Sequence, residues 1–116
     1  MSSDSSDFRH VRLARNQTLF RSVNERVEKI VHQFSADAPV GFVCECAIQD
    51  CTNHIELARD EYEGIRLNAT HFFVLPDHVF PEVEAVVEDR GRYVIVEKFG
   101  VGGRVAAATD TRQRPT

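Results

Sequence analysis

The sequence lacks the long apolar segments of membrane proteins. No apolar run among its 116 residues approaches the roughly 18 that a membrane-spanning helix needs. Residues 1–7 are rich in Ser and Asp and have neither the positive nor the apolar region of a signal peptide. We therefore expect a cytoplasmic protein with no membrane partner, in a compartment that keeps thiols reduced.

Familiar catalytic and nucleotide-binding motifs are absent as well. There is no His-Glu-x-x-His, no Gly-x-Ser-x-Gly and no zinc-deaminase signature. The glycine-rich run 100–103 lacks both the strand–loop–helix setting and the Lys-Ser/Thr pair of a phosphate-binding loop. These absences predict a protein that is not an enzyme and has no catalytic residues or organic cofactor.

The charge is unevenly distributed along the chain. The net charge is −4, yet residues 1–34 hold six Lys/Arg and four Asp/Glu, whereas residues 35–99 hold five and thirteen. An acidic central body repels a nucleic-acid backbone. Only the first segment or the tail could present a basic surface, and the arginines that could contact nucleic acid there are Arg9, Arg12, Arg15 and Arg21.

The apolar pattern predicts a single α+β domain over residues 9–99. We expect a long first helix on a small, mostly antiparallel sheet, with a second short helix inserted. Residues 1–8 are predicted to be disordered, and residues 100–116 to form a flexible tail. The strands are expected at 40–46, 54–57, 71–75, 83–88 and 92–99, with the last one central, and the helices at 9–34 and 58–68.

The first helix carries apolar residues at three- and four-residue steps. We interpret this stripe as a seam that faces the core, and an alternative is a face that binds a partner or a second copy of the chain. Leu13 and Leu19 extend the stripe toward the N-terminus. Its main members are Phe20, Val23, Val27, Ile30 and Phe34.

All three cysteines of the chain, Cys44, Cys46 and Cys51, lie within eight residues. Thiolates are soft ligands that suit zinc, and a structural zinc ion takes four ligands in a tetrahedron. A fourth donor is therefore needed. His78, in a proline-flanked loop, is favoured, and His54 is the alternative because it completes Cys-x-Cys-x4-Cys-x2-His.

Other interpretations of the thiols remain open. His71, Asp77 or a water could supply the fourth donor, and the cysteines could also be buried structural thiols or redox-active ones. Glu45 and Glu56 lie near the thiols in sequence and are interpreted as solvated surface acids. A filled Cys3His site leaves no open position for chemistry, which favours a structural clamp.

Several segments between residues 15 and 99 resemble a family of short, poorly characterised actinobacterial proteins. The resemblance implies a zinc site made of the three cysteines and a histidine in a Pro-Gly-His-like loop, which favours His78. Asp77 stands where that loop has glycine. The matching segments are 15–26, Phe42-Val43-Cys44-Glu45-Cys46, Cys51, Ile55-Glu56-Leu57, Glu61-Tyr62-Glu63, Pro76-Asp77-His78 and Val94-Ile95-Val96-Glu97-Lys98.

The sequence thus predicts a small, non-enzymatic zinc-binding domain that acts as a protein-interaction or regulatory module. A protein partner is expected, and a homodimer through the first helix is an alternative. Two other functions stay open: a nucleic-acid-associated regulator that uses the basic helix and tail, and a zinc or redox sensor or small metal-dependent enzyme.

Overall fold

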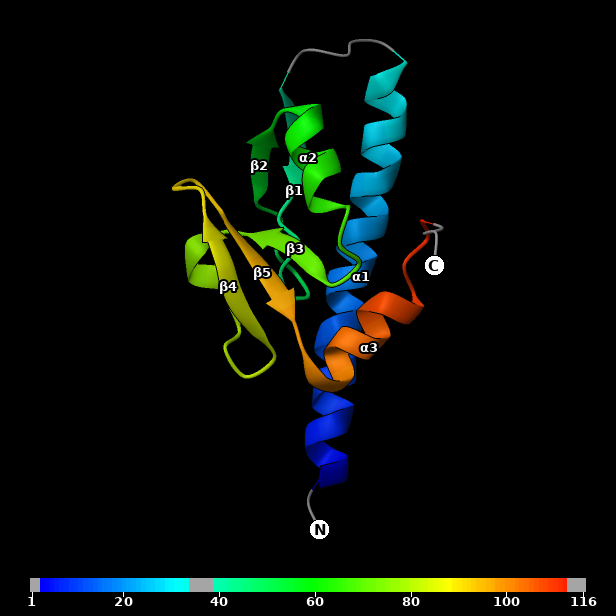
Figure 1. Cartoon of the computed structure of the whole chain (residues 1–116), viewed down its shortest axis with the longest axis vertical. Helices are drawn as coiled ribbons and strands as arrows, with labels where there is room; N and C mark the ends of the chain where they lie inside the picture. The colour runs from blue at the N-terminus through cyan, green and yellow to red at the C-terminus, as the bar shows by residue number, and fades with distance from the viewer. Residues whose placement is uncertain (1–2, 34–38, 113–116) are drawn as a thin grey trace.

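The computed structural model describes residues 3–33 and 39–112. A long helix runs along the molecule, two small sheets lie beside it, and a short C-terminal helix crosses it (Figure 1). This is the expected α+β arrangement. In chain order the elements are α1 (Ser3–His32), β1 (Val40–Val43), β2 (His54–Leu57), α2 (Arg59–Ile65), β3 (His71–Val74), the 3-10 turn η1 (Pro76–His78), β4 (Glu84–Asp89), β5 (Val94–Lys98) and α3 (Gly100–Ala108).

The strands form two antiparallel sheets rather than one. β1 pairs with β2, with Val43 opposite His54, and the second sheet has the order β3-β5-β4. β5 is central, as its apolar residues on both faces predict, and Val94, Ile95 and Val96 are all buried. β4 carries a bulge between Val86 and Glu88 on its pairing with β5.

Aromatic rings fill the core between the two sheets and α2. Phe42 of β1 stacks on Tyr62 of α2 with ring centroids 4.4 Å apart. Phe73 of β3 meets both rings edge-on and also contacts Tyr93. All four rings are fully buried. This cluster ties the first sheet to the second, and it determines where the loop after β1 lies.

The inward face of α1 is polar, which corrects the expected apolar seam. Leu19, Val23 and Ile30 are 60%, 39% and 58% exposed, although Leu13 is buried and Val27 packs partly against the core. Phe20 is half-buried, and Phe34 lies outside the described residues. The side chains that face inward, at three- and four-residue steps, are Gln17, Arg21, Asn24 and Glu28.

The polar face exists because α1 packs against irregular backbone. The chain leaves its strand after Val43, and buried N–H and C=O groups there need partners. Asn24 donates to the Val43 carbonyl and accepts from the Val43 N–H, both at 2.8 Å. Gln17 donates to the Glu45 carbonyl at 3.3 Å, and Asn16 to the Ala47 carbonyl at 3.1 Å. These amides replace the ladder partners that a neighbouring strand would supply.

Both chain ends are more ordered than expected. α1 starts at Ser3 rather than near residue 9, and a helix, α3, occupies the start of the expected flexible tail. α3 forms because Gly102, Gly103 and Ala106 are buried where it crosses α1 and β5. Residues 1–2 and 113–116 of the two expected flexible ends lie outside the described residues.

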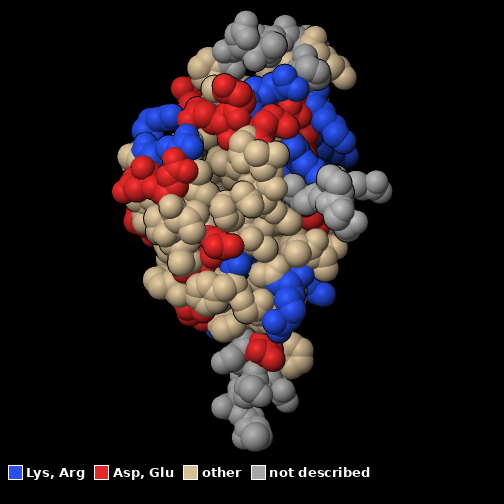
Figure 2. All heavy atoms as spheres, in the orientation of Figure 1, with Lys and Arg blue, Asp and Glu red and all other residues tan. Residues whose placement is uncertain are grey.

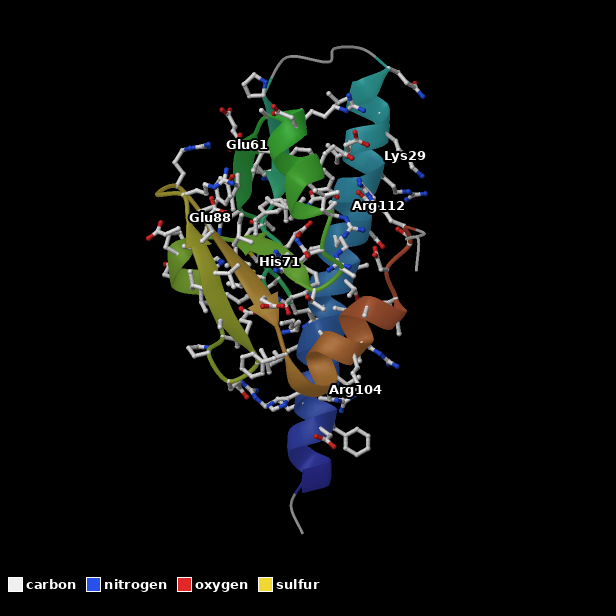
Figure 3. The ribbon with its side chains drawn as sticks, in the orientation of Figure 1. Lys29, Glu61, His71, Glu88, Arg104 and Arg112 are labelled. Atoms are coloured by element: carbon white, nitrogen blue, oxygen red, sulfur yellow. The ribbon has the colours of Figure 1, made fainter. Side chains whose placement is uncertain are left out.

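The segment after α3 is fixed to α1 and α2 by ion pairs. Arg112 reaches Glu25 of α1 and Glu63 of α2, with N···O distances of 2.7 Å and 2.9 Å, and it is labelled beside α1 in Figure 3. Burial alone would raise the pKa of Glu25, but hydrogen bonds from Arg112 and Tyr62 outweigh it and lower this pKa to about 2. Glu25 is therefore ionised at neutral pH and binds the C-terminal segment.

Within the described residues, no helix combines the length and apolarity that crossing a membrane would require.

Candidate metal centre

The cysteine segment forms the connection between β1 and β2. The Cys44 N–H donates to the Asn53 carbonyl at 2.9 Å, directly beyond the last paired residues of the hairpin. The Cys51 N–H donates to the Ile48 carbonyl at 3.1 Å and closes a turn. The strand ends before the thiols, which supplies the bend that two cysteines separated by one residue need in order to reach a common point.

The structure brings Cys44, Cys46, Cys51 and His78 together. One potential ligand atom from each lies within 4.8 Å of all the others. His78 Nδ1 is 3.6 Å from Cys44 Sγ and 3.7 Å from Cys51 Sγ. In a tetrahedral zinc site with Zn–S near 2.3 Å and Zn–N near 2.0–2.1 Å, sulfur and nitrogen lie about 3.5–3.6 Å apart. The two measured sulfur–nitrogen distances thus agree with such a site, and the other donor atoms lie within 4.8 Å of one another.

The turn η1 places His78 against the cysteine loop. Pro76 begins the turn, and the His78 N–H donates to the Leu75 carbonyl at 2.9 Å. Nδ1 faces the sulfurs, and Nε2 lies 3.8 Å from Asp77 Oδ1. Metal-binding histidines commonly direct their second nitrogen toward a carboxylate, which orients the ring. Asp77 is 85% exposed at its side chain and is not among the clustered donors.

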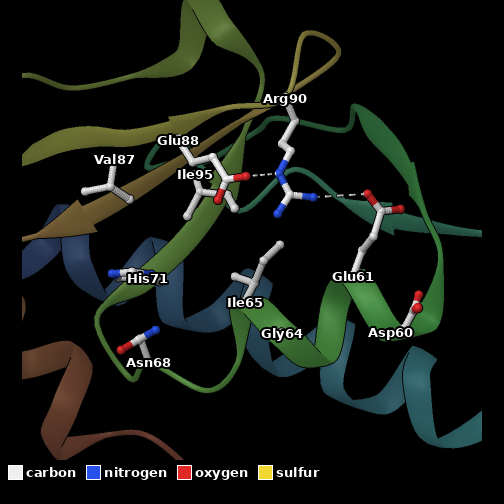
Figure 4. A pocket seen from close by; sticks show the side chains of 10 residues that line it. All are labelled: Asp60, Glu61, Gly64, Ile65, Asn68, His71, Val87, Glu88, Arg90 and Ile95. Carbon is white, nitrogen blue, oxygen red and sulfur yellow. Dashed lines mark hydrogen bonds and ion pairs between the residues drawn. The ribbon is translucent and has the colours of Figure 1, made fainter.

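Neither of the other two histidines considered as ligands belongs to the cluster. His54 pairs with Val43 in the hairpin ladder, and its side chain is exposed. Strand register therefore turns the alternative ligand away from the sulfurs. His71, on β3, lines a pocket beside α2 instead (Figure 4). Among the described histidines, only His78 lies with the thiols.

Each sulfur accepts a hydrogen bond from a nearby N–H group. The Leu75 N–H lies 3.3 Å from Cys44 Sγ, and the Asn53 side-chain amide lies 3.6 Å from Cys51 Sγ. The Ile48 N–H donates to Cys46. N–H donors stabilise thiolate over thiol, which is the form that binds metals. Two of these donors belong to the cysteine loop itself and the third follows β3, so two separate segments direct N–H groups at the sulfurs.

As free thiols, Cys44 and Cys46 titrate as a pair. The hydrogen bond from Cys44 lowers the pKa of Cys46 to about 5, and the same bond together with burial raises the pKa of Cys44. All three cysteines are free of disulfides. Cys44 and Cys46 are buried and Cys51 is partly exposed. The three cysteines and His78 could together hold one metal ion.

The prediction that Glu45 is a solvated surface acid beside the thiols was wrong. It is fully buried, and its carboxylate accepts from the Asn24 side chain at 2.9 Å. Burial raises the pKa of Glu45 to about 7, although Asn24 and the guanidinium of Arg21 oppose that rise. Its backbone N–H donates to the Phe73 carbonyl at 3.0 Å and ties the loop to β3. Glu56 is exposed, as expected.

Two of the four arginines considered for nucleic-acid contact are engaged within the chain. Arg21 is only 3% exposed; it donates to the Ala69 carbonyl at 2.6 Å and covers the Phe72 ring. The prediction that Arg21 belongs to a basic surface was wrong, because Arg21 lies on the inward, polar face of α1. Arg9 forms a two-pronged ion pair with Glu82, at 2.8 Å and 2.9 Å. Arg12 and Arg15 are exposed.

A pocket of about 420 Å³, which was not predicted from the sequence, lies between α2 and the second sheet. Its floor is apolar, with Ile65 and Ile95. Arg90 crosses the opening and contacts Glu88 on one side and Glu61 on the other (Figure 4). No signal in the sequence places these residues together, because α2 and the β4–β5 hairpin meet only in the fold. The pocket contains none of the clustered thiols.

The fold and the cluster define a small α+β protein with a Cys3His group that could hold a metal ion. The chain matches no protein-family model, no curated protein and no solved structure. The resemblance to the actinobacterial family therefore stays a prediction.

Proposed function

We propose that Cys44, Cys46, Cys51 and His78 bind one Zn²⁺ in a closed structural site. The observation that carries this proposal is the convergence of three sulfurs and one imidazole nitrogen, from two separate segments, within 4.8 Å of one another. Three thiolates and an imidazole are a common donor set of structural zinc. Their softness disfavours magnesium and calcium, which take oxygen ligands.

The proposed ion has a structural role because of what it joins. The cysteines belong to the loop of the β1–β2 sheet, and His78 follows β3 of the other sheet. Apparent zinc-binding free energies in zinc-finger peptides are about 10–16 kcal/mol, which is as large as the whole net stability of a typical domain, about 5–15 kcal/mol. Four protein ligands also fill the tetrahedron and leave no position for a substrate.

The biological task therefore belongs to the surface of the protein. We infer a non-enzymatic module that binds a protein partner, an inference supported by the closed donor set and the lack of catalytic motifs. A nucleic-acid partner has weaker support, because Arg9 and Arg21 are engaged within the chain. One observation favours a zinc or redox sensor: Cys51 is partly exposed, so an oxidant or chelator could reach it.

Replacing the two competing histidines separately tests the site. His78→Ala removes the fourth donor and should lose zinc to a chelator much faster than the unaltered protein. His54→Ala is the matched control and should retain one zinc per chain, measured by native mass spectrometry. Zinc loss from His54→Ala with retention in His78→Ala would contradict the assignment. Rapid, reversible zinc exchange in the unaltered protein would favour the sensor.

A further inference from the structure

The outward face of α1 carries large apolar side chains without a partner in the described structure. Phe8 is 73% exposed, and Leu19, Val23 and Ile30 lie on the same side of the helix. At about 3.6 residues per turn, these positions fall opposite the buried polar face of Gln17 and Asn24. These four outward apolar residues of α1 thus serve neither the core nor the cysteine loop.

Four cations share this outward face. All four are exposed, and none forms an ion pair or side-chain hydrogen bond within the described part of the chain. They are Arg12, Arg15, Arg26 and Lys29. Lys29 points away from the body in Figure 3, and Lys and Arg atoms gather over the upper half of α1 in Figure 2.

Most of the other described cations form ion pairs or hydrogen bonds within the chain, so the outward face of α1 differs from the rest of the protein in its unpaired positive charge. Arg104 of α3 is the remaining described cation without a partner in ranges 3–33 and 39–112. The engaged ones are Arg9, Arg21, Arg59, Arg66, Arg90, Arg92, Lys98 and Arg112. An acidic protein of net charge −4 therefore keeps a concentrated, unneutralised positive stripe on one helix.

We propose that the outward face of α1 binds an acidic amphipathic helix of a partner protein. This deepens the proposed function and rests on its assignment of a protein partner. Leu19, Val23 and Ile30 would pack against apolar residues of the partner helix. Carboxylates beside that apolar stripe would pair with the four cations. Complementary charge of this kind speeds association and selects the partner.

The arrangement of the arginines disfavours a membrane as the occupant. Arg12, Leu19 and Arg26 follow one another at seven-residue steps, so the guanidinium groups lie in line with the apolar side chains. Burying that line as deep as Leu19 in the hydrocarbon layer would remove the guanidinium groups from water, in a layer that holds no counter-charge. A partner helix can supply a carboxylate at each such position.

A second copy of the chain is disfavoured for a related reason. Pairing two α1 outward faces would bring four cations of each copy together. The two acidic residues between Phe8 and Ile30 are Glu25 and Glu28. They are paired with Arg112 and Arg59, so neither is available to the outward face. Like charges across an interface are repulsive, and nothing on the face neutralises them.

A designed peptide tests the proposal. The probe is a fluorescent helix of about four heptads with Leu at the apolar positions and Glu at the flanking ones. Fluorescence anisotropy should show saturable binding to the zinc-loaded protein, weakening as salt is raised. Arg12→Glu combined with Arg26→Glu should weaken binding by about tenfold or more. Arg104→Glu, an equally exposed cation on another helix, should leave binding unchanged.

Specificity is tested with a scrambled peptide of the same composition and charge, which should bind at least about tenfold more weakly. Equal binding of both peptides, or equal weakening by Arg104→Glu, would overturn the proposal. So would tighter binding to vesicles of phosphatidylcholine and phosphatidylglycerol, or dimerisation of the chain seen in analytical ultracentrifugation and abolished by Leu19→Glu. Zinc is measured in the same samples so that the two proposals can fail separately. Protein that contains no zinc but still binds the peptide would contradict the proposed metal site and leave the proposed binding face intact.

Discussion

Asn24 shows at the scale of one residue how α1 holds the cysteine loop between β1 and β2. Its side chain makes both hydrogen bonds that the Val43 backbone would otherwise make with a strand, and it also donates to Glu45. The side chain is fully buried, so water cannot replace these partners. A polar residue at this position therefore contributes through the backbone groups that it satisfies, rather than through apolar contact.

We predict that Asn24→Ala lowers the free energy of unfolding by about 2–3 kcal/mol, because it strands a buried N–H, a buried C=O and a carboxylate. Urea denaturation of the zinc-loaded protein measures the change. Ser22→Ala, at an exposed position of the same helix, is the control and should stay within about 0.5 kcal/mol of the unaltered protein. Similar values for the two variants would show that the amide does not carry this role.

The candidate ligands and the residues around them differ in how well the sequence predicts them. Thiol chemistry and clustering point to Cys44, Cys46 and Cys51 without any structure, and the proline-flanked loop points to His78. Glu45 could not be predicted, because its burial depends on Asn24 and Arg21, which lie more than twenty residues away in the chain. Local chemistry is visible in a sequence, whereas the partners of a buried charge depend on the tertiary fold.

α3 shows at the scale of an element how small residues let a helix approach a strand. A Cβ added to Gly103 would lie 2.9 Å from the Lys98 carbonyl oxygen, and one added to Gly102 would lie 3.1 Å from Lys98 Cε. The two glycines therefore permit the close crossing that buries Ala106. In the sequence the same glycines indicate flexibility, which is why the helix was not expected.

Two glycine substitutions with opposite expected effects on the free energy of unfolding test this packing. Gly103→Ala should destabilise the protein by about 1–3 kcal/mol, because the new methyl group meets backbone that cannot move freely. Gly64→Ala should stabilise it by about 0.5–1 kcal/mol, since nothing lies within 4 Å of the added Cβ and α2 favours alanine over glycine. Thermal unfolding of the zinc-loaded variants measures both. Stabilisation by Gly103→Ala would show that the crossing is looser than described.

α1 was predicted as a helix, but its orientation about its own axis was not. A stripe of Leu, Val and Ile usually marks the core side. Here part of the core side faces irregular backbone, which needs amides, so Leu19, Val23 and Ile30 are left outward. The strands were predicted more reliably, because Val94, Ile95 and Val96 show by their apolar character that β5 is covered on both faces. A helix that packs on the end of a strand and the loop after it departs from the usual apolar pattern.

At the scale of the whole molecule, the proposed zinc ion joins the two halves of the fold. The loop after β1 and the turn after β3 meet at the cluster, and the edge-on contact of Phe42 with Phe73 joins the same two sheets. Residues 39–98 thus carry the candidate metal centre, and α1 presents one face to them and one to solvent. This division separates the proposed structural role of the metal from the proposed binding role of the helix.

The coordination shell of the metal in the purified protein tests the central claim most directly. Native mass spectrometry should show one zinc per chain, and X-ray absorption at the zinc edge should show three sulfurs near 2.3 Å and one nitrogen near 2.0–2.1 Å. Such a shell is the signature of the closed Cys44, Cys46, Cys51 and His78 site. A shell that contains a water or carboxylate oxygen in place of the nitrogen, or a fully folded protein that carries no zinc, would contradict the account.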